Sequence, residues 1–351
     1  MFISVIIPVH NGGETFRRCL EALNQTLYDQ WECLVVDDNS TDGSAVVAQQ
    51  YGARVIGGWT KRLGPAQARN IGAQMARGDV LFFLDADVLV QPGTVGHVAA
   101  TMQAESQIAA CYGSYDDEPA ATNFLSRYRT MQHFYFHQHS NVAAATFRSS
   151  VGAIRRDIFL AMGGFNALAF PRPGIEDIEL GYRLHAAGYE IRLEKLLLVK
   201  HLKRWSWRDM VVTDIRDRAI PWTQLILQDK FVPNDLNLQR SQRLSTAVAI
   251  FGLLALLLVL FSSWGWLLVG ASVVTLLWLN HGFYSYVGHK RGVLFSLGAM
   301  LAHWFYLVYT GFAFLAGAGL YVMGRMIDYR GDRLRPLPST SYPLTRSSSK
   351  R

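Results

Sequence analysis

Two carboxylates that flank a single residue follow one of the most apolar segments of the sequence. Asp85 and Asp87 enclose Ala86 directly after residues 79–84, a segment that has the character of a buried strand. Carboxylates at this spacing can hold one hard divalent cation, such as Mg²⁺ or Mn²⁺, together with phosphate oxygens. Aspartates also stabilise turns and helix starts, so the tripeptide alone fits a metal site and a structural turn about equally well.

Two further polar segments could contact a nucleotide. Residues 37–43, with the sequence DDNSTDG, end another apolar run, and a carboxylate there can bind a nucleobase or ribose hydroxyls. Ser, Thr and Asp are also common helix caps, and both roles are compatible. Residues 64–70 begin a helical pattern, and Arg69 within it could neutralise a phosphate. Without context, an exposed helix arginine is the simpler interpretation of Arg69.

An acidic pair and a histidine in the second half are also candidates. Glu176 and Asp177 precede a helical pattern, and alone they fit the acidic first turn that a helix dipole favours. His201 ends an extended segment beside a basic run, where it fits a metal or phosphate ligand as well as an interfacial histidine.

Three histidines in residues 121–139 have a spacing that could bind metal. His133, His137 and His139 lie among aromatic residues, with no Cys or acid close by. Because catalytic zinc sites need a better-defined ligand set, we interpret this segment as an aromatic face and not as a metal site.

The elements that would position these residues alternate between apolar runs and helical patterns. Strands are predicted over 3–9, 31–36, 54–57 and 79–84, with helices over 15–26, 42–51 and 65–77. This alternation predicts an α/β fold with an open, mostly parallel sheet. Ligands of such sheets bind at the carboxyl ends of the strands. The expected crevice therefore brings together His10-Asn11, Asp37-Asp38 and Asp85-Asp87.

The last third of the chain predicts a membrane region. Residues 244–289 and 292–324 contain no Asp, Glu, Lys or Arg, and one crossing needs about 20 apolar residues. The first stretch fits two crossings that turn near residues 262–265. The second fits one long tilted helix or a bent pair. Core helices of a soluble protein carry a polar face, which residues 253–261 lack.

The charge distribution predicts which side of the membrane the first part occupies. The chain has 351 residues, a formal net charge of +7 and only 17% charged residues. Nine Lys or Arg and five Asp lie in residues 200–243, and excess positive charge marks the cytoplasmic side. Met1 leads directly into an apolar strand without a signal-peptide pattern. No nucleic-acid recognition module is recognisable, and three scattered cysteines suggest reduced thiols.

The basic tail raises a conflict about the number of crossings. Arg325, Arg330, Arg333 and Arg335 follow the last apolar segment. A cytoplasmic tail requires an even number of crossings, whereas the apolar segments suggest three. One segment would then be re-entrant or interfacial, or the tail does not follow the positive-inside rule.

The predicted organisation has four parts. Residues 1–205 form the α/β domain and residues 206–243 form amphipathic, membrane-proximal helices, whose tryptophans and arginines (among them Trp222 and Arg218) suit the headgroup layer. Residues 244–324 contain two to three transmembrane helices. Residues 325–351 form a basic, disordered tail.

The ordered set of motifs resembles the family-2 glycosyltransferases. The matching segments are 5–11 (VIIPVHN), 35–43 (VVDDNSTDG), 68–72 (ARNIG), 78–87 (GDVLFFLDAD), 163–165 (GGF) and 176–181 (EDIELG). The resemblance covers about residues 3–205. It implies the GT-A fold, a nucleoside-diphosphate sugar as donor, and transfer with inversion.

The resemblance implies a nucleotide site made of Pro8, Asn11, Asp38, Arg69 and Asp85. In this assignment Asp38 reads the base and Arg69 contacts the phosphates. Asp85 binds the ribose or the water shell of the metal.

The resemblance also implies a metal and a base. Asp87 would bind Mg²⁺ or Mn²⁺ at the diphosphate, with His201 as a further ligand. Asp177 would be the general base, and Glu176 would position the acceptor. Polymerising members carry Gln or Arg, two residues, then Arg-Trp. His201 replaces that first residue here, so processive synthesis is not expected.

These inferences predict a multi-pass enzyme of the cytoplasmic membrane, with its catalytic domain in the cytoplasm. It would transfer a sugar to a hydroxyl of a lipid or lipid-linked acceptor. One alternative is transfer to a polyprenyl phosphate, which needs no base because phosphate is already a nucleophile. A less favoured alternative is a non-catalytic scaffold that binds nucleotide sugars.

Overall fold

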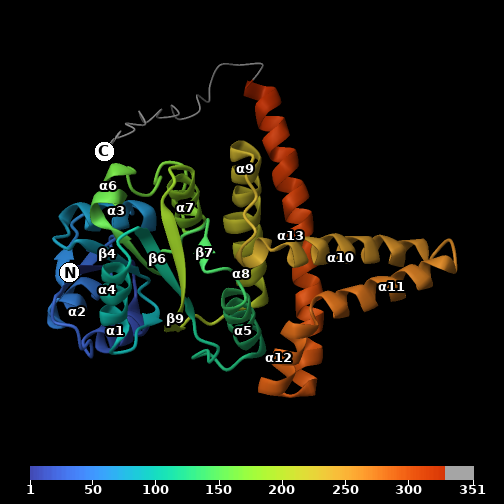
Figure 1. The fold of residues 1–351 in the computed structure, drawn as a ribbon, viewed down its shortest axis with the longest axis horizontal. Helices are drawn as coiled ribbons and strands as arrows, with labels where there is room; N and C mark the ends of the chain where they lie inside the picture. The colour runs from blue at the N-terminus through green and yellow to red at the C-terminus, as the bar shows by residue number, and fades with distance from the viewer. Residues whose placement is uncertain (329–351) are drawn as a thin grey trace, which may run out of the picture.

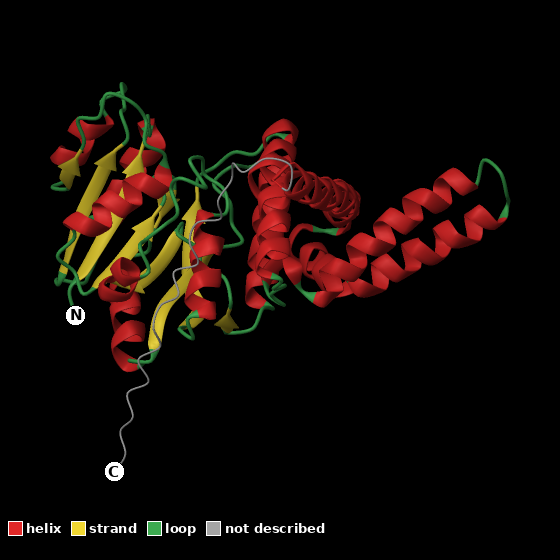
Figure 2. Cartoon of the chain, turned by 90° about the horizontal axis from the view of Figure 1, so that it is seen from above, coloured by secondary structure: helices red, strands yellow, loops and turns green. Residues whose placement is uncertain are grey.

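The computed structural model describes residues 1–328 of the chain. A sheet flanked by helices forms the first part, and helices alone form the second (Figures 1 and 2). A basic tail is predicted over 325–351. Residues 325–328 of it belong to the last helix, and residues 329–351 lie outside the described residues.

Nine strands form one sheet in the described residues, in the order β3-β2-β1-β4-β8-β6-β9-β5, with β7 paired to β9. Their bounds are β1 Ile3–Val9, β2 Trp31–Asp37, β3 Arg54–Ile56, β4 Val80–Leu84, β5 Val88–Leu89, β6 Ile108–Tyr115, β7 Ala143–Ala144, β8 Val151–Arg155 and β9 Glu190–His201. Strands β3, β2, β1 and β4 run parallel. Their carboxyl ends therefore share one edge, as the alternating pattern predicts.

The second half of the sheet combines parallel and antiparallel pairs, and β6 runs parallel to β9. Strand β8 lies between β4 and β6 and is antiparallel to both, and the short strands β5 and β7 are antiparallel to β9. The sheet is mixed.

Helices cover both faces of the sheet. They are α1 Gly13–Leu23, α2 Ser44–Gln50, α3 Pro65–Met75, α4 Thr94–Ala104, α5 Phe124–Gln138, α6 Arg156–Ala161 and α7 Glu176–Ala186. Successive residues of a strand point to opposite faces. Val5 and Ile7 accordingly pack in one core with Leu20 of α1, whereas Ile6 packs in a second core with Ala68 of α3.

The second part is helical. It contains α8 Trp207–Val212, the π-helix η1 Thr213–Ala219, α9 Ile220–Asp229, the short 3₁₀ helix η2 Leu236–Leu238, α10 Arg240–Leu258, α11 Trp264–Leu279, α12 His281–Arg291 and α13 Val293–Asp328. The predicted turn lies between α10 and α11, and the last apolar stretch forms one long helix. By length and composition α10 and α13 could each cross a membrane, and α11 with α12, bent by 69°, could form a third span.

Gly72 provides a test of how closely α3 packs on the sheet. A Cβ at this position would lie 2.5 Å from Ile6 Cγ2 and 3.2 Å from Val36 Cγ2. Overpacking a close-packed core costs about 1–3 kcal/mol, so Gly72→Ala should lower the free energy of unfolding by that amount in a denaturation experiment. Gly93→Ala is the control, because a Cβ there meets nothing within 4 Å. Equal stability of the two variants would contradict this packing.

Candidate active site

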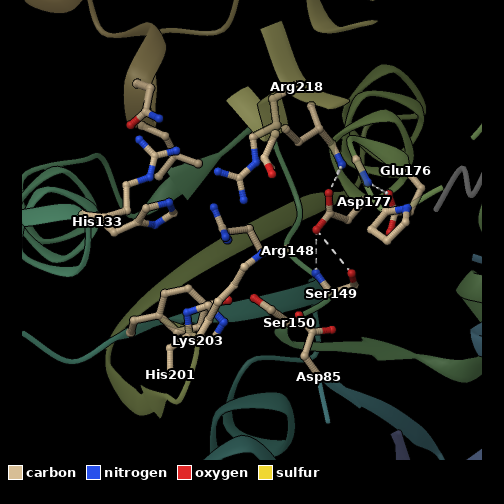
Figure 3. A pocket seen from close by; sticks show the side chains of 18 of the residues that line it. Asp85, His133, Arg148, Ser149, Ser150, Glu176, Asp177, His201, Lys203 and Arg218 are labelled. Carbon is tan, nitrogen blue, oxygen red and sulfur yellow. Dashed lines mark hydrogen bonds between the residues drawn. The ribbon is translucent and has the colours of Figure 1, made fainter. Parts of the chain in front are cut away.

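A cavity of about 220 Å³ lies where the sheet meets the helical region. Its sheet side carries Asp85 and Asp87 from the turn after β4, and His201 from the end of β9. Asp177 comes from the start of α7, and the opposite side is built by α5, η1 and α9 (Figure 3). The carboxyl edge predicted to bind ligands is therefore one wall of this cavity.

A buried arginine ties three segments of this wall together. Arg69 Nη2 lies 2.6 Å from Asp85 Oδ1, and its Nη1 lies 2.9 Å from Glu176 Oε1. Burial opposes the charge of the guanidinium, but the two carboxylates more than offset this and keep the pKa of Arg69 above its usual value. An arginine held in this way anchors α3, the turn after β4 and α7 to one another.

Glu176 is the second buried member of this cluster. Its Oε2 accepts a hydrogen bond of 2.8 Å from the N–H of Gly174. Burial and the adjacent Asp177 raise the pKa of Glu176, although Arg69 acts in the opposite direction. Both carboxylate oxygens are thus engaged with protein groups, and Glu176 orients Arg69 in this structure.

Asp177 is oriented by backbone and side-chain donors. Its Oδ2 accepts hydrogen bonds from the N–H of Ser149 at 2.9 Å and from Ser149 Oγ at 3.3 Å. Its Oδ1 accepts from the N–H of Ile178 at 2.8 Å, within the first turn of α7. Because Asp177 also lines the cavity, its carboxylate is fixed at a place where it can accept a proton from a bound hydroxyl.

The two residues predicted to hold a metal are neighbours. Pairing of Val88 with His201 joins β5 to β9, and His201 Nε2 lies 3.3 Å from Asp87 Oδ2. Burial alone would raise the pKa of Asp87. The hydrogen bond and the charge of His201 together outweigh burial, so the pKa of Asp87 lies below its usual value. Within residues 1–328 no group of three or more His, Cys, Asp or Glu side chains could hold a metal ion. A cation here would need further ligands from a bound phosphate or water.

Three residues of the predicted nucleotide site lie outside the cavity lining. Asp38 is buried, and its carboxylate accepts hydrogen bonds from the N–H groups of Leu63 and Gly64 at 2.5 and 3.0 Å. Asn11 Oδ1 accepts from the N–H of Thr41 at 2.8 Å, and Pro8 lies within β1. In this structure Asp38 therefore fixes the loop before α3.

Three cations also line the cavity. Arg148 comes from the loop before β8, Lys203 from the segment after β9 and Arg218 from η1; Figure 3 shows Arg148 near the centre of the cavity and Lys203 beside His201. The Arg148 guanidinium lies 6.0 Å from the centre of the Tyr115 ring, and Lys203 Nζ lies 4.0 Å from the Trp205 ring. Among the described residues, no ion pair neutralises Arg148 or Lys203. Such a cluster is suited to an anion with several oxygens.

Arg218 connects this cluster to a buried ion pair. Arg129 of α5 and Asp214 of η1 form a buried salt bridge, and Arg218 Nη1 lies 3.3 Å from the same Asp214 oxygen. Partial burial and the nearby Arg129 lower the pKa of Arg218. Tyr309 of α13 donates a hydrogen bond of 2.7 Å to Asp214 Oδ2. The long C-terminal helix thus contacts the network that shapes the cavity.

Residues 4–162 match the family model described as glycosyl transferase family 2. The chain contains a family-2 glycosyltransferase domain. A probable glycosyltransferase, YdaM of Bacillus subtilis, is 25% identical over 221 residues, which are 59% of this chain and 52% of YdaM. The validoxylamine A glucosyltransferase of Streptomyces hygroscopicus is 31% identical over 228 residues, 55% of this chain and 53% of that relative. The chain spans about half the length of these relatives.

The glycosyltransferase domain also has the expected fold. A solved structure, the mannosyltransferase PcManGT from Pyrobaculum calidifontis in complex with GDP-Man and Mn²⁺, superposes with a TM-score of 0.56 at 15% identity. The match covers 95% of this chain and 88% of that chain. The predicted GT-A fold is confirmed, whereas the individual residue roles stay predictions.

The cavity contains residues that the sequence did not single out. Arg148 follows no motif, and Arg218 appears in sequence only as part of a basic, tryptophan-containing segment. Trp222 was expected in a headgroup layer, yet it lines the cavity and donates a hydrogen bond of 2.8 Å to Tyr182 Oη. A local pattern carries no signal for such roles, because the cavity forms between segments that are distant in the sequence.

The two histidines of α5 and His139, which directly follows α5, lie in different environments. His133 and His137 are buried and line the cavity, whereas His139 is exposed. Burial, reinforced by Arg148, lowers the pKa of His137 to about 3. A neutral His137 therefore belongs to the wall of the cavity.

The lowered pKa of His137 predicts a pH dependence of stability. Below the unfolded value of about 6.5, the unfolded chain binds a proton at His137 that the folded chain does not bind. The free energy of unfolding should therefore fall as the pH falls below 6.5, by up to about 1.4 kcal/mol per pH unit from this group. In denaturation curves between pH 6.5 and 5, His137→Gln should show a shallower decline than the wild type. His139→Gln is the exposed control, and equal slopes for all three proteins would contradict the prediction.

Proposed function

We propose that the protein is a membrane-anchored, inverting glycosyltransferase. It moves a sugar from a nucleoside-diphosphate sugar to a hydroxyl of a lipid or lipid-linked acceptor. The observation that carries the proposal is the arrangement of one cavity, in which an oriented carboxylate, Asp177, faces both a possible metal-binding pair and a cluster of cations. Such a cavity suits the attack of a hydroxyl on a sugar that leaves an anionic diphosphate.

Asp87 and His201 are the residues that would hold a divalent cation. Their donor set of one carboxylate and one imidazole leaves positions for phosphate oxygens and water, as Mg²⁺ and Mn²⁺ prefer. The related PcManGT structure contains Mn²⁺ with GDP-Man. When bound, the cation would neutralise charge on the diphosphate.

Arg148, Lys203 and Arg218 would neutralise the remaining negative charge of the diphosphate leaving group. Arg69 was expected to contact the phosphates, but its guanidinium is engaged with Asp85 and Glu176. Arg148 and Lys203 are better placed to bind phosphate oxygens, because they need not give up a buried carboxylate, and Arg218 would add to them while it keeps its contact with Asp214. Arg69 would act through the residues that it holds.

Asp177 would accept the proton of the acceptor hydroxyl. The hydrogen bonds from Ser149 and Ile178 restrict its carboxylate to one orientation. A single base on the side of the sugar opposite the diphosphate gives one in-line displacement and inverts the anomeric carbon. Asp38, Asn11 and Pro8 would contribute to the nucleoside end of the site, next to the carboxyl ends of β1 and β2.

We place the acceptor at the membrane because of the apolar helices. Two described helices could cross a bilayer, and a soluble acceptor would require no such region. We place the enzyme in the cytoplasmic membrane, with the glycosyltransferase domain in the cytoplasm, because Lys and Arg are concentrated just before the apolar helices.

Turnover of a donor panel tests this proposal. Full-length protein in detergent, with Mn²⁺ or Mg²⁺ and total membrane lipid, should release nucleoside diphosphate from one sugar donor. Asp177→Asn should lower the rate about 10²–10⁴-fold, the usual contribution of a general base, while it retains nucleoside-diphosphate binding. Asp87→Asn should lose metal-dependent binding, and Asp157→Asn, an exposed position on α6, should behave as wild type.

Two outcomes would contradict the proposal, and each would favour an alternative function. Full turnover of Asp177→Asn together with an inactive Asp87→Asn would indicate a phosphate acceptor such as a polyprenyl phosphate. Binding of nucleoside diphosphate without turnover of any donor would favour a non-catalytic scaffold.

The role of the cations has a separate test. Arg148→Gln removes one charge-assisted contact, and such contacts contribute roughly 1.5–3 kcal/mol. Its affinity for the nucleoside diphosphate should fall about 10- to 100-fold, and its affinity for the uncharged nucleoside should not change. Arg18→Gln, on the exposed surface of α1, is the control for net charge. Calorimetric titration gives both affinities, and an equal loss for nucleoside and diphosphate would exclude a phosphate contact.

A further inference from the structure

The three long apolar helices differ in length relative to a bilayer. Helices α10 and α11 have 19 and 16 residues, and α13 has 36. At 1.5 Å per residue these are about 28, 24 and 54 Å long. The hydrocarbon core is about 30 Å thick, so α10 comes close to it, α11 is somewhat short and would need local thinning of the bilayer, and α13 is almost twice as long.

The helices also point in different directions. In Figure 1, α10 and α11 form a hairpin that projects away from the glycosyltransferase domain, while α13 runs alongside α9 and crosses the base of the hairpin. In Figure 2 the hairpin lies across the view and α13 is seen nearly along its axis. The hairpin and α13 meet at Gly311, where a Cβ would lie 3.0 Å from Thr246 Cγ2. Therefore the hairpin and α13 cannot both stand upright in one flat bilayer.

The hairpin has the surface of a membrane-spanning element. Apolar side chains are exposed along both helices, including Leu254 at 58% and Val274 at 66%. Phe261 and Trp264 are exposed at its tip, where aromatic residues suit the far headgroup region. Polar side chains pair at the other end, where Asn280 hydrogen-bonds Gln242 at 3.0 Å.

Charged residues lie only at the base of this hairpin. Arg240 and Arg243 occupy the first turn of α10, and Lys290 and Arg291 follow at the end of α12. No charged residue occurs between Arg243 and Lys290. This distribution fits a base on the cytoplasmic side and a tip on the opposite side.

Helix α13 has one face that contacts protein and one that is exposed. Near its middle, Tyr309 donates to Asp214, and the Tyr306 ring lies 5.4 Å from the Arg129 guanidinium. If α13 stood upright in the bilayer, this ion pair and the domain around it would lie at the depth of the hydrocarbon core, where charges are costly. Its outer face exposes Leu301 and Leu315 at 71% and 57%, which suits a helix lying in the interface.

We propose that only α10 and α11 cross the bilayer, and that α13 lies along the cytoplasmic surface with its outer face among the headgroups and upper acyl chains. This inference rests on the proposed membrane anchoring. Two crossings place the domain and Arg325 on the same side, which satisfies the positive-inside rule at both ends of the apolar region. It also holds the cavity wall formed by η1 and α9 directly behind the membrane surface, since α13 packs on α9 and η1.

Single-cysteine labelling of the full chain in cells tests this topology. Cys19, Cys33 and Cys111 are first replaced by Ala. Ser263→Cys at the tip should react with a membrane-impermeant maleimide in intact cells. Val293→Cys and Gly324→Cys, near the two ends of α13, should react only after lysis. Gly93→Cys, exposed in the glycosyltransferase domain, is the control for the cytoplasmic side.

Two labelling patterns would overturn the inference. Reaction of Val293→Cys and Gly324→Cys from opposite sides would show that α13 spans the bilayer. Reaction of Ser263→Cys only after lysis would show that the hairpin does not cross. Neither result depends on transfer activity, so a failed donor assay leaves this test intact. Recovery of the chain without membranes would instead contradict the proposed anchoring itself.

Discussion

The buried guanidinium of Arg69 is the constraint on which the candidate site depends. A buried charge is tolerated only when it is paired and hydrogen-bonded, and Arg69 finds both partners at 2.6 and 2.9 Å. These partners come from the turn after β4 and from the start of α7. The close approach of α3 to β1, which Gly72 permits, brings the guanidinium to them. The positions of Asp87, two residues after Asp85, and of Asp177, directly after Glu176, follow from the same contacts.

The cavity collects carboxylates and cations from different elements. The sheet and α7 contribute the carboxylates, and the loop before β8, the segment after β9 and η1 contribute Arg148, Lys203 and Arg218. Asp85 is paired with Arg69 and Arg218 with Asp214, whereas no ion pair among the described residues neutralises Arg148 or Lys203. A ligand that combines a cation with a polyanion would interact favourably with both the carboxylates and these cations. A nucleoside diphosphate with its metal has this composition.

The helical region contributes to the cavity as well as to the proposed anchoring. Asp214 lies on the π-helix η1, and π-helical turns often occur at functional sites. It is shared by Arg129 from α5, by Arg218 and by Tyr309 from α13. The side of the cavity nearest the helices is therefore held by a helix that we place on the membrane surface. Under the proposed function, the same contacts would serve both anchoring and catalysis.

The sequence alone determined the elements and the family. Apolar runs and helical periodicity report local burial, and they were sufficient for β1, β2, β4 and α7, for the carboxylates after the strands, and for the apolar helices. Tertiary structure decided the partners. Arg69 and Glu176 are 107 positions apart, and Arg129 and Asp214 are 85 apart. No local pattern encodes such pairs, because which charges meet depends on how the sheet and helices pack. The antiparallel course of β8, the place of Arg148 and Arg218 in the cavity, and the course of α13 along the domain became visible only when distant segments were brought together.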